Sequence, residues 1–148
     1  MDEATTAPRR KRTAAHRFRD FLARQGFRPW VEDDFPGCIW FNFEGYRYLV
    51  RLEDGDDDYV QVALGYLLEE DCRDELALLR AVNETQAETK VVKVFLAPRL
   101  EFVEFQVELF LGGHPMSLEL LQRCLLILRG TSRAYLDRVQ PEAPKARA

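Results

Sequence analysis

The sequence contains few of the residues that build metal, disulfide or cofactor sites. It has two histidines and three cysteines, no Cys-x-x-Cys pair, and no metal-ligand spacing around either histidine. The cysteines, Cys38, Cys72 and Cys124, are odd in number and widely separated. This spacing argues against a disulfide framework and favours reduced thiols in a cytoplasmic protein. We therefore expect no metal ion and no other cofactor.

Long apolar runs and an excess of positive charge are also missing. No apolar stretch approaches the roughly 20 residues that a membrane-spanning helix needs, and no apolar signal segment follows the basic residues near the N-terminus. The net charge of −4 argues against a nucleic-acid-binding domain, because such domains are usually basic. The sequence therefore predicts a globular protein without membrane insertion and without a nucleic-acid partner.

Only the two ends of the chain lack periodic hydrophobicity. Residues 1–12 are small, polar and basic, residues 140–148 are rich in alanine and proline, and we expect both to be disordered tails. Residues 13–139 are long enough for a single domain with its own core. The basic cluster from Arg9 to Arg12 is compatible with binding to nucleic acid or an acidic membrane, but we favour a solvated tail.

The stretch from Leu100 to Leu111 organises the rest of the chain, because apolar and polar residues alternate along it as they do in a half-buried strand. One of its faces is continuously apolar and consists of Val103, Phe105, Val107, Leu109 and Leu111. The other face is mostly polar. This pattern is typical of an antiparallel sheet that packs helices on one side only.

The remaining elements follow from the same reasoning. We expect helices over residues 13–25, 69–88 and 117–139, and strands over residues 38–43, 46–52, 59–68, 90–97 and 100–111, with a short edge strand at 30–32. The inner stripe of the second helix should consist of Leu76, Leu79, Val82 and Asn83, widened by Leu78 and Ala81. The predicted fold is α+β. Its antiparallel sheet has five to six strands, a meander plus a hairpin, with helices on one face in the order α-β-β-β-α-β-β-α.

Four apolar residues fall on the face of the sheet that should be polar: Trp40, Leu49, Phe102 and Phe110. Exposed apolar or aromatic surface on a soluble domain commonly marks a binding site for a partner. The alternative is that a tail, the first helix or a loop covers these side chains, and the sequence does not decide between the two. We take the four residues as a hypothetical binding surface.

The last helix is apolar over more of its circumference than a surface helix usually is. Its main stripe consists of Leu118, Leu121, Leu125, Leu128 and Tyr135. A second, adjacent stripe consists of Leu120, Cys124 and Ile127. Either the helix is clamped between the sheet and another helix, or the second stripe forms a dimer interface with another copy of the chain.

Catalytic motifs are not visible. His114 lies in a Gly-Gly-His-Pro turn, but no serine or cysteine nucleophile motif accompanies it, so we favour a surface turn residue. The aspartates between Asp54 and Asp58 do not match a calcium loop, because the sixth and twelfth positions counted from Asp54 are Tyr59 and Gly65. There is also no glycine-rich phosphate loop. The sequence thus predicts a protein that is not an enzyme and has no catalytic residues.

The order of elements resembles the bacterial YbjN-like family within the type III secretion chaperone-like fold. The resemblance covers residues 14–139 and is clearest in the helix at 74–84, the strand at 90–96, the strand from 103–105 onward and the helix at 118–125. It implies a cytoplasmic bacterial protein without enzymatic activity. Secretion chaperones of this fold typically form homodimers and hold an extended cargo segment against a hydrophobic surface. No cargo-binding residue carries over, because the likeness is one of hydrophobic pattern.

The leading hypothesis is therefore a non-enzymatic, chaperone-like protein-binding domain that forms a homodimer and holds a partner protein or secreted cargo on exposed apolar surface. The alternative is a regulatory module that binds a small ligand between sheet and helices. A third reading, an enzyme, would require several titratable residues to converge in one deep cleft.

Overall fold

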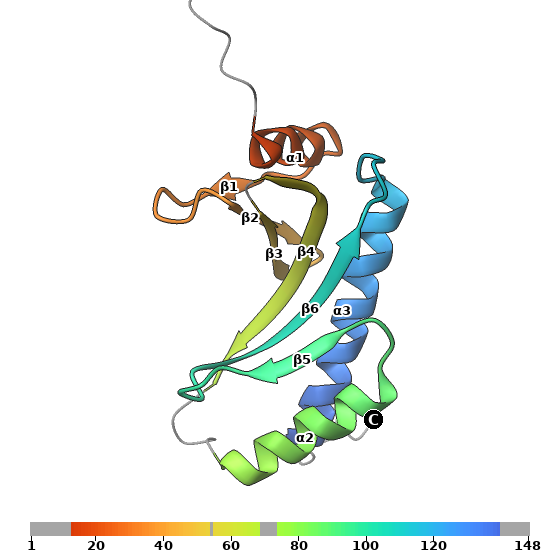
Figure 1. Ribbon diagram of the computed structural model, residues 1–148. Helices are drawn as coiled ribbons and strands as arrows, with labels where there is room; N and C mark the ends of the chain where they lie inside the picture. Colours follow the sequence, from red (N-terminus) through yellow and green to blue (C-terminus); the bar gives the residue numbers. More distant parts are fainter. Residues whose placement is uncertain (1–12, 54, 69–73, 140–148) are drawn as a thin grey trace, which may run out of the picture.

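A computed structural model describes residues 13–53, 55–68 and 74–139 of the chain. The tails predicted at 1–12 and 140–148, and the predicted start of the second helix at 69–73, lie outside the described residues. The described residues form three helices and one six-stranded sheet (Figure 1).

The sheet is antiparallel throughout, as predicted, with the strand order β1-β2-β3-β4-β6-β5. Its strands are β1 (Trp30–Val31), β2 (Cys38–Phe43), β3 (Tyr46–Glu53), β4 (Asp56–Leu67), β5 (Lys93–Leu96) and β6 (Phe102–Phe110). The first four strands form the meander, and the β5–β6 hairpin joins it where β6 pairs with β4. The predicted edge strand before the meander is confirmed as β1.

The turn between β2 and β3 fixes the register of the meander. Glu44 and Gly45 both have positive φ angles, 47° and 83°. Positive φ at both central residues defines the two-residue type I′ turn, whose twist matches that of the flanking strands. The resulting register places Trp40 opposite Leu49.

The three helices are α1 (Ala14–Arg24), α2 (Glu75–Glu88) and α3 (Leu118–Val139). Each follows a short polar residue whose side chain accepts a hydrogen bond from a backbone N–H of the first turn: Thr13, Asp74 and Ser117. These N-caps satisfy donors that would otherwise lack a partner, so they set where the helices begin. All three helices contribute to a single core on the inner face of the sheet.

The core confirms the predicted apolar face of β6 and the main stripe of α3. Phe105 and Val103 of β6 are fully buried, as are Leu121, Leu125 and Leu128 of α3. The Tyr48 hydroxyl on β3 donates a hydrogen bond to the backbone carbonyl oxygen of Leu125 at 3.2 Å. Burial raises the pKa of Tyr48 to about 12, so this phenol stays protonated and ties α3 to the sheet.

The predicted inner stripe of α2 is wrong in part. Leu76 and Leu79 are 58% and 46% exposed, whereas the buried residues of the helix are Leu78, Ala81 and Thr85. The Thr85 hydroxyl accepts a hydrogen bond from Arg138 of α3 at 2.9 Å. Leu78 and Ala81, which we predicted to widen the stripe, are thus confirmed as buried, whereas the predicted Asn83 is exposed. Hydrophobicity alone does not identify the buried hydroxyl of Thr85.

The outer edge of β5 is covered by a side chain of α2. The Gln86 Oε1 atom accepts a hydrogen bond from the Val94 N–H at 2.7 Å, and Gln86 Nε2 donates to the Val92 carbonyl oxygen at 2.8 Å. A residue of a parallel neighbouring strand would bond to the same two positions, one on either side of Lys93. The Gln86 amide thus occupies backbone groups that an edge strand otherwise presents to other chains.

Candidate functional site

The face of the sheet opposite the helices carries a groove with a volume of about 360 Å³. Residues from four strands, β2, β3, β4 and β6, line it. They are Trp40, Arg47, Leu49, Arg51, Ala63, Gly65, Tyr66, Leu67, Phe102 and Glu104. Most of the lining is apolar, and it includes three charged residues, Arg47, Arg51 and Glu104.

The pairing of β3, β4 and β6 builds the groove. Leu49 lies opposite Ala63, Gly65 opposite Glu104, and Leu67 opposite Phe102. Ala63 and Gly65 are two residues apart on β4 and therefore share a face. Because neither has a large side chain, the surface is low over β4 and higher over its neighbours, which creates the hollow.

A charged pair lies beside this hollow. Arg51 of β3 reaches across β4 to Glu104 of β6 and forms two hydrogen bonds with its carboxylate, one of them 3.0 Å between Nη2 and Oε2. Arg51 also donates to Gln61 Oε1 at 2.7 Å. The bonds to Glu104 raise the pKa of Arg51, and a bidentate pair of this kind fixes both side chains. The charge of Glu104, whose side chain is only 8% exposed, is thereby balanced.

Arg47 provides a second cation at the rim of the groove. Its guanidinium carbon lies 5.6 Å from the centroid of the Trp30 ring, within the range of a cation–π contact. Among the residues that the structure describes, no carboxylate forms an ion pair with Arg47. Since Arg51 and Glu104 cancel, the groove lining has a net positive charge.

Beyond the groove the same face carries a hydrogen-bonded polar cluster around Glu108. The Lys93 ammonium lies 3.0 Å from Glu108 Oε1, which also accepts hydrogen bonds from Gln61 and Gln106. The hydrogen bond from Lys93 lowers the pKa of Glu108. The outer face is thus divided into a charged, hydrogen-bonded part and an apolar groove.

Three of the four residues of the hypothetical binding surface meet in this groove: Trp40, Leu49 and Phe102. The expectation that all of them are exposed is wrong for Leu49, which is 6% exposed, while Trp40 and Phe102 are half-buried. Phe110 lies at the other end of β6, is 75% exposed and contacts the Tyr59 ring at a centroid distance of 5.8 Å. Sequence reasoning missed Ala63, Gly65 and the Arg51–Glu104 pair. The alternation of two small residues along β4 was the available signal.

The second stripe of α3 packs within the chain. Cys124 is 3% exposed and belongs to the core, while Leu120 and Ile127 are half-buried against it. Burial raises the pKa of the Cys124 thiol to about 11, so it has the character of a packing residue and not of a nucleophile. The dimer interface that we predicted on this stripe stays a prediction.

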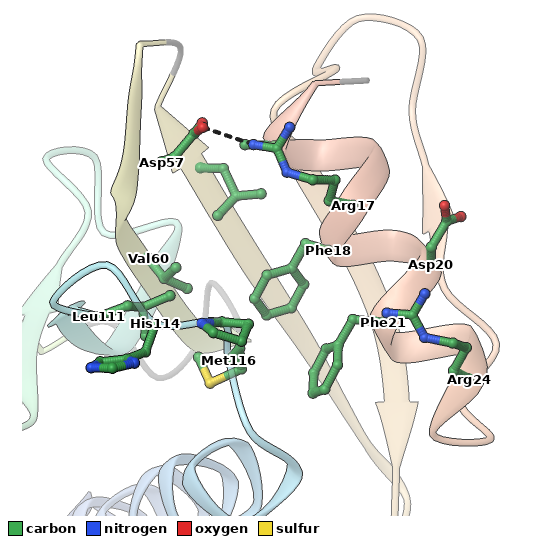
Figure 2. Close-up of a pocket in the computed structure, with 13 residues that line it drawn as sticks. Arg17, Phe18, Asp20, Phe21, Arg24, Asp57, Val60, Leu111, His114 and Met116 are labelled. Atoms are coloured by element: carbon green, nitrogen blue, oxygen red, sulfur yellow. Dashed lines mark hydrogen bonds and ion pairs between the residues drawn. The ribbon is translucent and has the colours of Figure 1, made fainter. Parts of the chain in front are cut away.

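A second cavity, of about 350 Å³, lies between α1, β4 and the turn before α3. Figure 2 shows Phe18 and Phe21 of α1 facing it, with His114 and Met116 on the other side. Arg17 bridges α1 to Asp57 of β4 at 2.8 Å. Among the described residues, the lining contains no serine, threonine, cysteine or lysine, so His114 has no such nucleophile to activate there.

The described part of the chain contains neither a metal-binding cluster nor a membrane-spanning helix. Within residues 13–53, 55–68 and 74–139, no three histidine, cysteine or carboxylate side chains are grouped so that they would hold a metal ion. In the same residues, no helix combines the length and the apolar character needed to cross a membrane.

The topology and the inner-face helices define the class of fold: it is the YbjN-like, type III secretion chaperone-like fold that the sequence patterns predicted. Three solved structures share it. The first is a protein from Methanothermobacter thermautotrophicus, described as uncharacterized, with a TM-score of 0.57, 14% identity, and coverage of 86% of this chain and 97% of that chain.

The second is a chain of the HopA1–SchA chaperone–effector complex, with a TM-score of 0.54, 14% identity, and coverage of 78% of this chain and 87% of that one. The third is YbjN, a proposed transcription regulator from E. coli, with a TM-score of 0.54, 15% identity, and coverage of 84% and 87%. No protein-family model and no curated protein sequence matches the chain. At these identities the likeness establishes the fold.

Proposed function

We propose that this chain is a non-enzymatic, chaperone-like domain that holds a segment of a partner protein in the outer-face groove. The observation that carries the proposal is the groove itself, in which Trp40, Leu49 and Phe102 converge on a sheet face that none of the described helices covers. Leu67 at its rim is 86% exposed, an unusual position for a large apolar side chain. The fold shared with a chaperone–effector complex supports the same conclusion.

The energetics are sufficient for reversible binding. Burial of one large apolar side chain in such a groove contributes about 1.5–3 kcal/mol. A few such anchors, after the cost of ordering a flexible segment, correspond to about micromolar affinity. The Arg51–Glu104 pair holds the groove floor in place, so little reorganisation accompanies binding.

The proposal includes two further elements, a homodimer and a location in the bacterial cytoplasm. The stripe residues Leu120 and Ile127 of α3 are only half-buried, and Leu126, next to Ile127 in the chain, is 50% exposed. A second copy would cover this apolar surface. Light scattering coupled to size-exclusion chromatography tests the dimer, and a strictly monomeric chain at high concentration would remove this part of the proposal.

A displayed library of random 12-residue peptides, selected against the immobilised full-length chain, tests the proposal directly. We expect Leu67→Glu to weaken the selected peptides at least tenfold, because it places a charge at the rim of the groove. Phe110→Glu is the matched control, since Phe110 is similarly exposed on the same face but lies outside the groove. Failure to select any peptide, or equal loss of binding in both variants, would contradict the proposal.

A further inference from the structure

The hollow of the groove is a consequence of side-chain size and not of backbone strain. A Cβ atom placed on Gly65 would approach the Val103 carbonyl oxygen at 3.6 Å, an ordinary contact, and the φ angle of Gly65 is not in the positive region. A glycine inside a strand weakens it and often marks a place where a ligand comes close. Gly65 therefore leaves a space that the fold itself does not require.

Charge is distributed unevenly around this space. On one side, Glu104 lies opposite Gly65 and is already paired with Arg51. On the other side, Arg47 of β3 lines the same groove as Gly65. Arg47 has a ring contact with Trp30 but no carboxylate partner among the residues described. The hollow thus lies between Arg51, whose charge is neutralised by Glu104, and Arg47, which has no ion-pair partner among the described residues.

We propose, on the basis of the function proposed above, that the bound segment is extended, inserts one bulky apolar side chain over Gly65 and places a carboxylate against Arg47. In an extended chain, residues two positions apart point to the same side at a separation of roughly 7 Å. The recognised pattern is therefore a large apolar residue with aspartate or glutamate two positions away. Guanidinium groups favour carboxylates because they form bidentate hydrogen bonds with them.

The first test fills the hollow. Gly65→Val adds a side chain that strands favour and that the backbone accommodates, so we expect an unchanged or higher melting temperature. The same substitution should weaken the peptides selected on the natural chain at least tenfold. Loss of binding in a variant that folds as well as the natural chain separates occupation of the hollow from unfolding.

The second test reverses the charge. Two synthetic peptides that differ only in carrying aspartate or lysine two positions from a phenylalanine are measured by fluorescence anisotropy against the natural chain and against Arg47→Glu. We expect the natural chain to prefer the aspartate peptide at least tenfold and Arg47→Glu to prefer the lysine peptide. Arg47→Met, which removes the charge, should bind the two peptides about equally.

The outcomes distinguish this inference from the proposed function. If selected peptides lose affinity on Gly65→Val and Leu67→Glu but carry no acidic residue and ignore Arg47→Glu, the groove binds peptides and the acidic pattern is wrong. If no peptide is selected, or the selected peptides bind both groove variants like the natural chain, both proposals are overturned. Binding of lipid vesicles or of single-stranded DNA in place of peptides would also overturn both.

Discussion

The two faces of strand β6 bury side chains by different means. Phe105 on the inner face and its neighbour Glu104 on the outer face are 0% and 6% exposed. Helices cover Phe105, whose ring lies 5.6 Å from that of Tyr135 on α3. None of the described helices packs on Glu104, whose carboxylate is held by Arg51 of the same sheet. Helices therefore cover one face of the strand. On the other face, side chains of neighbouring strands contact one another and no described helix packs over them.

This difference separates stability from binding. Substitutions on the inner face remove contacts between layers, and their cost should appear in the free energy of unfolding. Substitutions at exposed positions of the outer groove, such as Gly65 and Leu67, should alter binding with little effect on folding. The predictions that follow test this separation in order of expected size.

The largest effect is expected for Phe105→Asp. This substitution places an unpaired charge at a fully buried position. The free-energy cost of burying that charge exceeds the stability of a typical domain of this size. The variant should lack a cooperative thermal transition in circular dichroism. A soluble variant that melts cooperatively would show that the inner and outer faces of β6 have been assigned the wrong way round.

Two neighbouring leucines of α2 provide the next test. Leu78 is 4% exposed and Leu79 is 46% exposed. Leu78→Ala should lower the free energy of unfolding by about 2–4 kcal/mol because it leaves a cavity, whereas Leu79→Ala should cost less than about 1 kcal/mol. Urea denaturation measures the free energy of unfolding of both variants. Equal losses would contradict the assignment of Leu78 to the buried face and Leu79 to the exposed face of α2.

The outer-face pair should have a smaller effect. Glu104→Gln leaves Arg51 without its carboxylate partner, and we expect a loss of about 1–2 kcal/mol, reduced because the Arg51 side chain is 36% exposed. The double variant Arg51→Met, Glu104→Met should lose less than the sum of the two single substitutions to methionine. Additive losses in this double-mutant cycle would show that the pair is not coupled.

The smallest effect concerns pH. The pKa of Glu108 is lowered from its ordinary value of 4.5, chiefly by the hydrogen bond from Lys93. A carboxylate with a lowered folded-state pKa stabilises the fold above its unfolded pKa, and this contribution is lost as pH falls through the folded value. A carboxyl-carbon NMR titration should place its midpoint below 4.5, and Lys93→Met should raise it. An unshifted midpoint in the natural chain would show that the hydrogen bond from Lys93 does not lower the pKa of Glu108.

Local sequence patterns were sufficient to predict most of the fold. Strict alternation defined β2 with the bounds that the structure has, and Ser117 marked the start of α3. For α2 the pattern was ambiguous, because apolar residues at positions 76, 78, 79, 81 and 82 are compatible with more than one buried face. Only contacts with α3, such as that between Thr85 and Arg138, decide which face is inside.

The groove was predictable in part for a related reason. Alternation placed Trp40, Leu49 and Phe102 on the outer face, but it did not indicate which of them are neighbours. The β2–β3 turn makes Trp40 and Leu49 neighbours, but Phe102 joins them only through the pairing of β4 with β6, strands about 40 residues apart in the chain. The same long-range register brings Arg51 to Glu104, so neither the charged pair nor the hollow over Gly65 follows from local pattern.

The amide of Gln86 constrains how this protein recognises anything. It bonds to the Val92 carbonyl oxygen and the Val94 N–H at one edge of the sheet. The strand at the opposite edge, β1, is only two residues long. A partner consequently finds little backbone with which to extend the sheet as a further strand. Selectivity must then come from the side chains of the binding partner. The same protection disfavours edge-to-edge pairing between copies of the protein, and so the growth of fibrils.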